Sequence, residues 1–189
     1  MGDDDVRFFG VPQRLTLDDG VVIRRYVEDD MPAVVDVVNA NLEHLAPWMP
    51  WAQEPMTLDG QRAFFTETDK QWDEGTNFVY GVFDPSGRIV GGTGFHVRNG
   101  PGVLEIGYWL ARDAEGKGLM TRVVETLTAS ASTVEGVIRV EIHCDAGNAR
   151  SVAIPKRLGY TMVRVEDREV AAPAETGKQL IFAVDLPTS

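Results

Sequence analysis

A Gly-Lys-Gly turn at residues 116–118 is the feature that most narrows the folds open to this chain. It follows a strand-like run over residues 103–110 and opens a helix predicted over residues 118–130, whose apolar residues recur at helical spacing. An apolar strand is predicted over residues 137–144. Strand, helix and strand in this order make a β-α-β unit, and chemistry is expected near its strand-to-helix turn.

The segments before this unit combine a hairpin, two helices and more strands. Turn-forming residues at 18–20 separate two apolar runs and predict an N-terminal hairpin, with residues 1–12 as a flexible, exposed arm. Helices are expected from Asp30 to before Pro47 and from the capping residue Thr57 to about Trp72. Strands over residues 78–83 and 89–97 should form an antiparallel meander with residues 103–110.

The segments after the unit read as a helix and a closing pair of strands. The helix should run from its cap Asn148 to Gly159, with Pro155 expected to kink or shorten it. The last strands are predicted over residues 160–165 and 179–186, and the polar stretch 172–177 between them as an exposed loop. With 189 residues and 43% hydrophobic content, we expect one domain over residues 1–189, of the α+β class with a mixed sheet.

The charge balance limits the class of partner. A formal net charge of −11 opposes nucleic-acid binding, which relies on Lys and Arg replacing the counterions of phosphates. The same field favours cationic partners, amines among them, although surplus carboxylates also serve solubility.

Cysteine and histidine usage argues against disulfides and metals. Cys144 is the only cysteine, and a lone Cys that ends an apolar strand is usually buried packing and not an acyl carrier. The three histidines lack metal-ligand spacing, so no metal is expected. An acidic N-terminus and the lack of a long apolar run predict a cytoplasmic protein that does not enter a membrane.

Gly116 and Gly118 suit a pyrophosphate cradle. Between a strand and a helix, glycines let a phosphate approach backbone N–H groups at the positive end of the helix dipole. A lone Gly-x-Gly is also an ordinary tight turn. The segment lacks the spacing of P-loop nucleotide-binding proteins and the three glycines of dinucleotide folds, so neither class is supported.

Three motifs together carry a resemblance. Glu-Ile-Gly-Tyr-Trp-Leu at residues 105–110, Gly-Lys-Gly-Leu-Met-Thr at 116–121, and Asn-Ala-Arg-Ser at 148–151 followed by Leu-Gly-Tyr at 158–160 resemble the RimJ/RimL branch of the GCN5-related N-acetyltransferases (GNAT). The resemblance implies the GNAT fold, with a splayed strand pair and flanking helices, and acetyl-coenzyme A as cosubstrate. It assigns cofactor contacts to Ile106, Gly107, Trp109, Leu110, Gly116, Lys117, Gly118, Met120, Thr121 and Asn148.

Two residues depart from the family pattern. Asp113 stands where relatives often have Gln or Arg, and its charge would repel a pyrophosphate unless it turns away or Arg112 compensates. Arg122 stands where relatives often have Glu.

Three residues are candidates for catalysis. By resemblance, Glu105 is the base that deprotonates the incoming amine, directly or through water; otherwise it is a surface carboxylate or a partner for an Arg. Ser151 is expected to protonate the departing thiolate, although Asn148 and Ser151 also fit ordinary helix capping. Tyr108 is an alternative acid, ranked below Ser151.

The acceptor is expected to be an amine. Trp48, Met49 and Trp51 resemble the loop that covers the acceptor groove in relatives, or else pack on the core, and His96 is the histidine placed nearest the acceptor. An α-amine with a pKa of about 8 is easier to deprotonate than a lysine near 10.4, which favours a peptide or protein N-terminus. Acetylation of a small amine and a non-catalytic acyl-coenzyme A-binding module stay as alternatives, and monomer and homodimer are both open.

Overall fold

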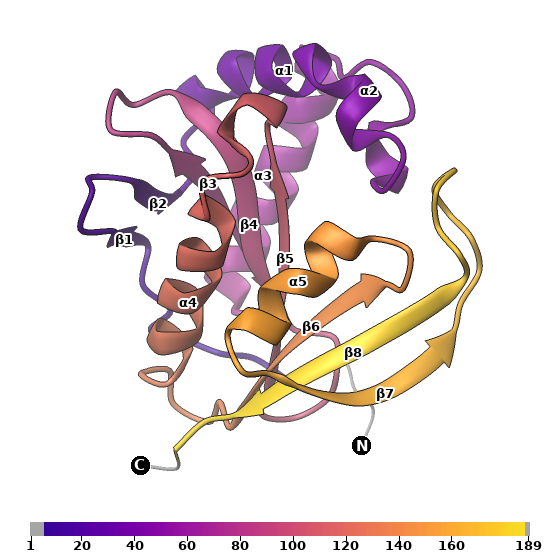
Figure 1. The fold of residues 1–189 in the computed structure, drawn as a ribbon. Coiled ribbons are helices and arrows are strands. Elements are labelled where there is room, and N and C mark those ends of the chain that lie inside the picture. The colour runs from indigo at the N-terminus through magenta and orange to yellow at the C-terminus, as the bar shows by residue number, and fades with distance from the viewer. Residues whose placement is uncertain (1–5, 188–189) are drawn as a thin grey trace.

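One continuous sheet organises the molecule. The computed structural model describes residues 6–187, and its eight strands follow the order β1-β2-β3-β4-β5-β6-β8-β7 (Figure 1). Every neighbouring pair is antiparallel except β5–β6, which is parallel. The strands are β1 Arg14–Thr16, β2 Val22–Arg25, β3 Asn77–Phe83, β4 Ile89–His96, β5 Val103–Leu110, β6 Arg139–Asp145, β7 Thr161–Asp167 and β8 Lys178–Asp185.

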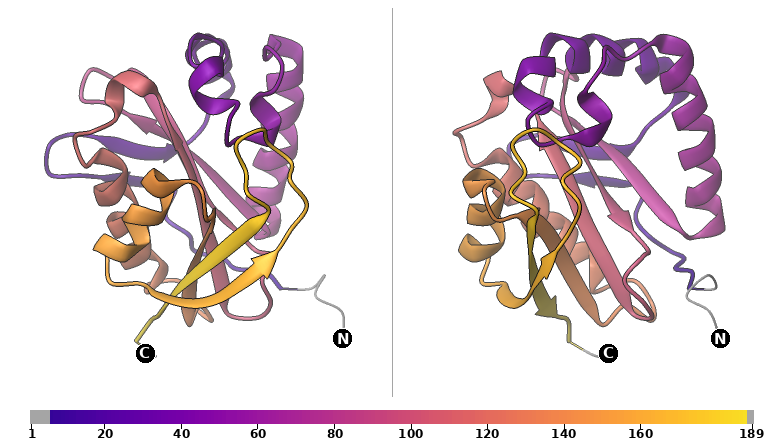
Figure 2. Two further views of the ribbon diagram at one scale, coloured as in Figure 1. Left: turned by 45° about the vertical axis from the view of Figure 1, so that its right-hand side comes forward. Right: turned by 90° about the vertical axis from the view of Figure 1, so that its right-hand side faces the viewer.

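Helices cover both faces of the sheet. In the views of Figures 1 and 2, α4 and α5 lie on one side and α1 to α3 on the other. Their bounds are α1 Met31–Ala40, α2 Leu42–Leu45, α3 Leu58–Glu74, α4 Leu119–Ala131 and α5 Ala149–Arg157, with short 3-10 turns at η2 Glu28–Asp30, η3 Pro50–Ala52 and η4 Arg112–Ala114. The expected α+β architecture is confirmed.

Local chemistry sets most of these boundaries. The Thr57 hydroxyl accepts from the Gly60 N–H at 3.2 Å and begins α3, and Gly75 ends it at φ 76°. The helix expected to reach Pro47 instead breaks at Asn41, whose side chain donates to the Val37 carbonyl at 2.8 Å. An Asn side chain that bonds a nearby carbonyl competes with helix continuation.

Two segments expected to be exposed are partly buried. Phe8 and Val11 are 4% and 6% exposed and join the core, so residues 6–12 are not an exposed arm, while residues 1–5 lie outside the described residues. In the β7–β8 loop, Ala172 is 2% exposed. Both predictions were wrong for one reason: isolated apolar residues in polar or glycine-rich segments give no periodic signal.

Candidate active site

The pair β5–β6 opens like a V. Register partners run only from Val103↔Arg139 to Glu105↔Glu141, yet β5 continues to Leu110 and β6 to Asp145. Beyond Glu105, the edge of β5 that faces β6 is therefore not paired with it. This is the splayed pair that the sequence motifs implied, and it leaves main-chain groups of Ile106 to Leu110 able to hold an extended ligand.

The glycine turn presents a row of free donors. The consecutive N–H groups from Gly116 to Thr121 donate no hydrogen bond to any described residue. Gly116 and Gly118 have φ of 76° and 69°, and a Cβ at either would meet no atom within 4 Å, so their backbone faces open space. Gly118 is also the N-cap of α4. The turn thus has the donors, the room and the helix dipole that bind an anion.

Side chains around the turn contribute less to the anion site than its backbone does. Met120 is 6% exposed and packs into the core, and Lys117 is exposed with its Nζ 3.4 Å from the Asp113 carbonyl. The carboxylate of Asp113 turns to Arg88, at 2.7 Å, and this hydrogen bond lowers its pKa. Arg122 pairs with Asp19 at 2.5 Å. Both departures from the family pattern therefore have partners of their own, away from the free N–H row.

A tyrosine and a serine meet across the V. The Tyr108 hydroxyl lies 3.1 Å from Ser151 Oγ and donates to the Ser151 carbonyl, also at 3.1 Å. That carbonyl is free because Pro155, four residues on in α5, has no N–H to give it. The helix continues through Pro155 to Arg157. The effect of the proline is therefore to leave the Ser151 carbonyl without a helical partner, and this carbonyl accepts from Tyr108.

Two further side chains complete this end of the cavity. Asn148 caps α5 by accepting from the Ser151 N–H at 3.1 Å, so the capping interpretation holds, and its side chain also lines the cavity. Burial raises the pKa of Cys144 to about 11, with an opposing hydrogen bond from Ser151. Burial likewise raises the pKa of Tyr108. The thiol is therefore protonated at neutral pH, which agrees with its expected packing role.

Glu105 sits in a buried charge network. It accepts from Arg98 Nε and Asn99 Nδ2, each at 2.9 Å, and His143 Nδ1 lies 3.6 Å away. Burial would raise its pKa, but the bonds from Arg98 and the charge of His143 outweigh burial and lower it. Only 5% of this side chain is exposed. The Arg-partner interpretation is therefore realised, and the bonds from Arg98 and Asn99 engage both carboxylate oxygens, which leaves Glu105 less available to an amine than the resemblance implied.

His96 stands next to Glu105 on the same face of the sheet. The two are register partners in β4 and β5, and Asn77 is the partner of His96 in β3. Burial and the charge of Arg98 lower the pKa of His96 to about 4, against a smaller opposing effect of Glu105. A neutral imidazole thus borders the cavity.

Two loops form a roof over the side of the cavity where the acceptor is expected. The Ala174 N–H donates to the Pro47 carbonyl at 2.9 Å, and Figure 2 shows the β7–β8 loop lying against the segment after α2. The Asp145 carboxylate accepts from the Thr176 N–H and hydroxyl, both at 2.9 Å. The loop predicted as exposed is held in place by these bonds.

The aromatic loop has both roles considered for it. Met49 packs against the apolar cluster around α1, whereas Trp51 is 48% exposed and meets Trp109 edge-on at 6.0 Å. Trp48 approaches Gly147 at the base of the roof. The loop therefore packs on the core and edges the cavity.

A cavity of about 800 Å³ collects most of the predicted residues. It is lined by Trp48, Met49, Trp51, His96, Glu105, Ile106, Gly107, Tyr108, Trp109, Asn148 and Ser151, whereas Leu110 and the turn residues Gly116, Lys117, Gly118, Met120 and Thr121 lie outside the lining. Sequence reasoning missed Arg98, His143, Asp145, Arg168 and Glu175, which also line it. Arg98 had a usable signal, because a hairpin turn at residues 99–100 brings it close to Glu105.

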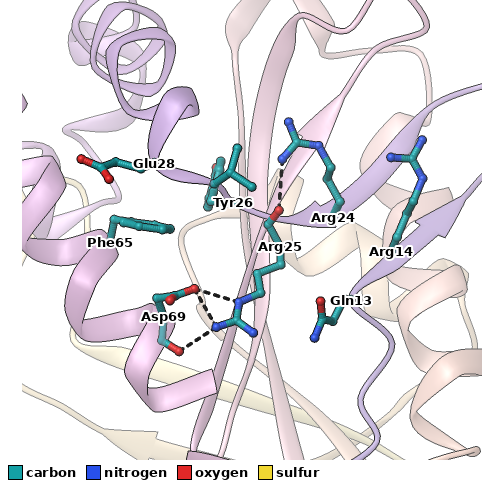
Figure 3. Close-up of a pocket in the computed structure, with 9 residues that line it drawn as sticks. Gln13, Arg14, Arg24, Arg25, Tyr26, Glu28, Phe65 and Asp69 are labelled. Atoms are coloured by element: carbon teal, nitrogen blue, oxygen red, sulfur yellow. Dashed lines mark hydrogen bonds and ion pairs between the residues drawn. The ribbon is translucent and has the colours of Figure 1, made fainter. Parts of the chain in front are cut away.

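A second, more open hollow of about 530 Å³ lies beside β2 and α3 (Figure 3). Two of the arginines that line it have carboxylate partners: Arg24 pairs with Asp30 at 2.8 Å, and Arg25 with Asp69 and Asp73. These ion pairs hold β2 against α3 and η2.

Two features are absent from residues 6–187. No helix there is long and apolar enough to cross a bilayer. Nor do these residues bring together three or more His, Cys, Asp or Glu side chains able to hold a metal ion.

Known proteins share this arrangement. Residues 21–161 match the family model described as Acetyltransferase (GNAT) domain. The protein named putative ribosomal N-acetyltransferase YdaF, from Bacillus subtilis strain 168, is 26% identical over 141 residues, which cover 74% of this chain and 77% of that protein.

Solved structures agree in fold. A RimL ribosomal L7/L12 α-N-protein acetyltransferase in complex with coenzyme A superposes with a TM-score of 0.81 at 20% identity, covering 93% of this chain and 97% of the other. The microcin C7 self-immunity acetyltransferase MccE, in complex with acetyl-coenzyme A and AMP, gives 0.84 at 18% identity with the same coverage. The free N–H row and the splay fit such a donor, and the chain belongs to the GNAT acetyltransferases, as an N-acetyltransferase that uses acetyl-coenzyme A.

Proposed function

We propose that this enzyme acetylates the N-terminal α-amine of a protein or peptide, of the kind found on ribosomal proteins. The observation that carries the proposal is the acceptor half of the cavity, where a neutral histidine and a carboxylate already paired with Arg98 stand beside apolar side chains. Such a site does little to stabilise a protonated amine. It suits an amine that reaches it neutral, as an α-amine with a pKa of about 8 does more readily than a lysine.

The site residues divide into donor and acceptor roles in this proposal. Main-chain groups of β5 and of the turn 116–121 hold acetyl-coenzyme A, which supplies the activated acetyl thioester. Ser151 and Tyr108, 3.1 Å apart, stand where a departing thiolate would need a hydrogen-bond donor. Glu105 fixes Arg98 and the electrostatic balance of the acceptor side. The named relatives that act on ribosomal proteins support this substrate class, and such a substrate would place the reaction in the cytoplasm.

A second candidate is acetylation of a small amine. The roof over the acceptor side, tied by the bond from Ala174 to Pro47, favours it because a closed pocket suits a compact substrate. A non-catalytic acyl-coenzyme A-binding module is the third candidate, and release of free coenzyme A on addition of an amine would exclude it.

The acceptor screen separates these functions. Peptides with a small N-terminal residue and one internal lysine are incubated with acetyl-coenzyme A, and mass spectrometry locates the added acetyl group. We expect it on the α-amine, and no product from the same peptide with a blocked N-terminus. Modification confined to lysine, or turnover with small nonpeptide amines alone, would contradict the N-terminal proposal.

A further inference from the structure

A chain of three hydrogen bonds between side chains runs from helix α3 to His96. Gln71 Nε2 donates to Glu67 Oε1, Asn77 Nδ2 donates to Gln71 Oε1, and the Asn77 Oδ1 atom lies against His96 Nδ1, each at 2.8 Å. Glu67 is at the exposed surface, whereas His96 borders the cavity. The chain therefore links a surface carboxylate to an imidazole in the active site.

The chain has a fixed direction. A carboxylate is an acceptor, so Gln71 must present its NH₂ group to Glu67 and its oxygen to Asn77. Asn77 must then present its NH₂ to Gln71 and its oxygen to His96. An oxygen cannot donate here, so the ring nitrogen that faces it carries the proton. The sequence of amides thus selects the Nδ1–H tautomer of His96 and leaves a lone pair on Nε2.

The free nitrogen faces the reaction site. Nε2 makes no hydrogen bond with any described residue. Because no fully buried side-chain nitrogen or oxygen of the described residues lacks a partner, Nε2 must be accessible to solvent. It lies so close to β5 that a Cβ on Gly107 would stand 2.9 Å from it. Gly107 belongs to the splayed part of β5, where the acetyl donor is expected. An accessible acceptor atom therefore points at the place where an amine would meet the thioester.

We propose that His96 Nε2 accepts a hydrogen bond from the acceptor amine and takes its proton during transfer, with Asn77 and Gln71 as positioning residues. The proposal rests on the proposed amine acetylation. The amine lone pair forms the bond to the acetyl carbon, the carbon–sulfur bond breaks with its electron pair on sulfur, and the surplus proton on nitrogen passes to Nε2. The imidazolium then returns that proton to solvent.

A weak base suffices for this step. The pKa of His96 is lowered to about 4, so Nε2 keeps its lone pair throughout the neutral range. An amine nitrogen that is acquiring an acyl group becomes far more acidic than a free ammonium, because its electron density moves into the new bond. The charged groups nearest the imidazole are Arg98 and Glu105, already paired with one another, with His143 beyond Glu105 and Glu67 reached only through the amides.

The tautomer is measured first, because it does not depend on turnover. Nitrogen-15 NMR of the histidine-labelled full chain reports which ring nitrogen carries the proton, and the His96→Gln variant identifies the signal among the three histidines. We expect Nδ1–H and an unprotonated Nε2 at neutral pH. An Nε2–H tautomer would overturn the proposal even if no acceptor had been found.

Kinetics with an identified acceptor then test the role in transfer. His96→Asn keeps a donor toward Asn77 but lacks an atom at the Nε2 position, so kcat should fall about 100-fold, the lower end for loss of a proton acceptor, with the acetyl-coenzyme A KM unchanged. His96→Gln, which restores a polar atom there, should recover part of it. Wild-type kcat in His96→Asn would exclude proton acceptance by His96.

Asn77→Asp gives a signature that a structural role would not produce. A carboxylate against Nδ1 should raise the imidazole pKa toward 7, so kcat/KM should fall about tenfold from pH 8 to pH 6 relative to wild type. The new acid limb should vanish in the Asn77→Asp/His96→Gln double variant. A limb that persists there, or none in Asn77→Asp when NMR shows the raised pKa, would refute the role of His96.

Discussion

The proposed donor and acceptor halves of the active site are built from different kinds of chemical group. The donor half is main chain: the unpaired edge of β5 and the free N–H row from Gly116 to Thr121. The acceptor half is side chain: Arg98, Glu105 and His96, set on β4 and β5 and the turn between them, and roofed by the β7–β8 loop. Backbone recognises what every donor of this family shares, whereas side chains can differ from one acceptor to the next. The contrast predicts that damage to each half has a different kinetic signature.

The largest expected effect comes from a substitution in the donor half. Gly118→Asp adds a side chain and a negative charge at a positive φ, where the anion is expected to bind. In the wild type, acetyl-coenzyme A at a hundredfold excess over Kd should raise the free energy of unfolding by about 2.7 kcal/mol and raise the melting temperature with it. The variant should lose this shift. Differential scanning fluorimetry measures it.

Gly10→Asp is the matched control for this change. Gly10 also has a positive φ and open space around it, but lies in the N-terminal segment. It should lose stability and keep the full cofactor-induced shift. A folded Gly118→Asp protein with the wild-type shift would remove the turn from the donor site.

The next effect concerns the charge network of the acceptor half. Glu105→Gln leaves Arg98 without its partner and should lower the free energy of unfolding by about 1–3 kcal/mol at neutral pH, while acetyl-coenzyme A still binds. Turnover should also fall, since Arg98 and His143 lose their fixed partner. Denaturant unfolding measures the stability, a thermal-shift titration measures binding of acetyl-coenzyme A, and release of free coenzyme A measures turnover.

The pH dependence gives the sign of this interaction. The folded-state pKa of Glu105 is lowered, so its stabilising contribution is complete above the unfolded value of about 4.3 and is lost as pH falls through the folded value. The stability difference between wild type and Glu105→Gln should therefore shrink in acid. Glu166→Gln, which breaks an exposed pair with Arg164, is the control and should change stability little. A difference that grows in acid would contradict the assignment.

A smaller effect tests the contact between Tyr108 and Ser151. Tyr108→Phe removes the donor to the Ser151 carbonyl and should cost about 1 kcal/mol of stability together with a drop in kcat. Ser151→Ala keeps that main-chain carbonyl and should be milder. Tyr160→Phe, which loses a bond to Thr128 elsewhere, should affect stability alone. A larger loss of kcat in Ser151→Ala than in Tyr108→Phe would instead favour Ser151 as the acid, which is the ranking expected from the sequence.

The smallest effect tests whether the β7–β8 loop belongs to the acceptor half. Thr176→Val removes the hydroxyl that donates to Asp145 and should raise the KM of the acceptor about fivefold, the equivalent of one hydrogen bond near 1 kcal/mol, without changing the KM of acetyl-coenzyme A. Thr66→Val on the exposed face of α3 is its control. Steady-state kinetics with each substrate varied in turn makes the measurement, and an effect on the donor KM alone would move this loop to the other half.

The same contrast explains what the sequence could predict. The donor half depends on residues adjacent in the chain, a strand, two glycines and a helix start, so its position could be inferred from a local pattern. The strand order and the splay required the resemblance, because spacing alone does not say which strands pair. The roles of the site residues stay predictions.

The acceptor half depends on residues that meet only after folding. Asn77, His96, Glu105 and Glu141 form one row across four neighbouring strands, which follows from register and not from spacing. The lowered pKa of Glu105 comes from Arg98, which no base motif contains. The buried Ala172 and Phe8 were missed because single apolar residues in irregular segments carry no period.

The bond from Tyr108 to the Ser151 carbonyl also has a mechanical consequence. Beyond Glu105↔Glu141 no ladder joins β5 to β6, so this hydroxyl acts as a strut from β5 to α5, the helix that follows β6. A strut can yield without unfolding either arm, since it is a single bond that does not belong to a strand or to a helix. Opening and closing of the V is then a local fluctuation, separate from global unfolding.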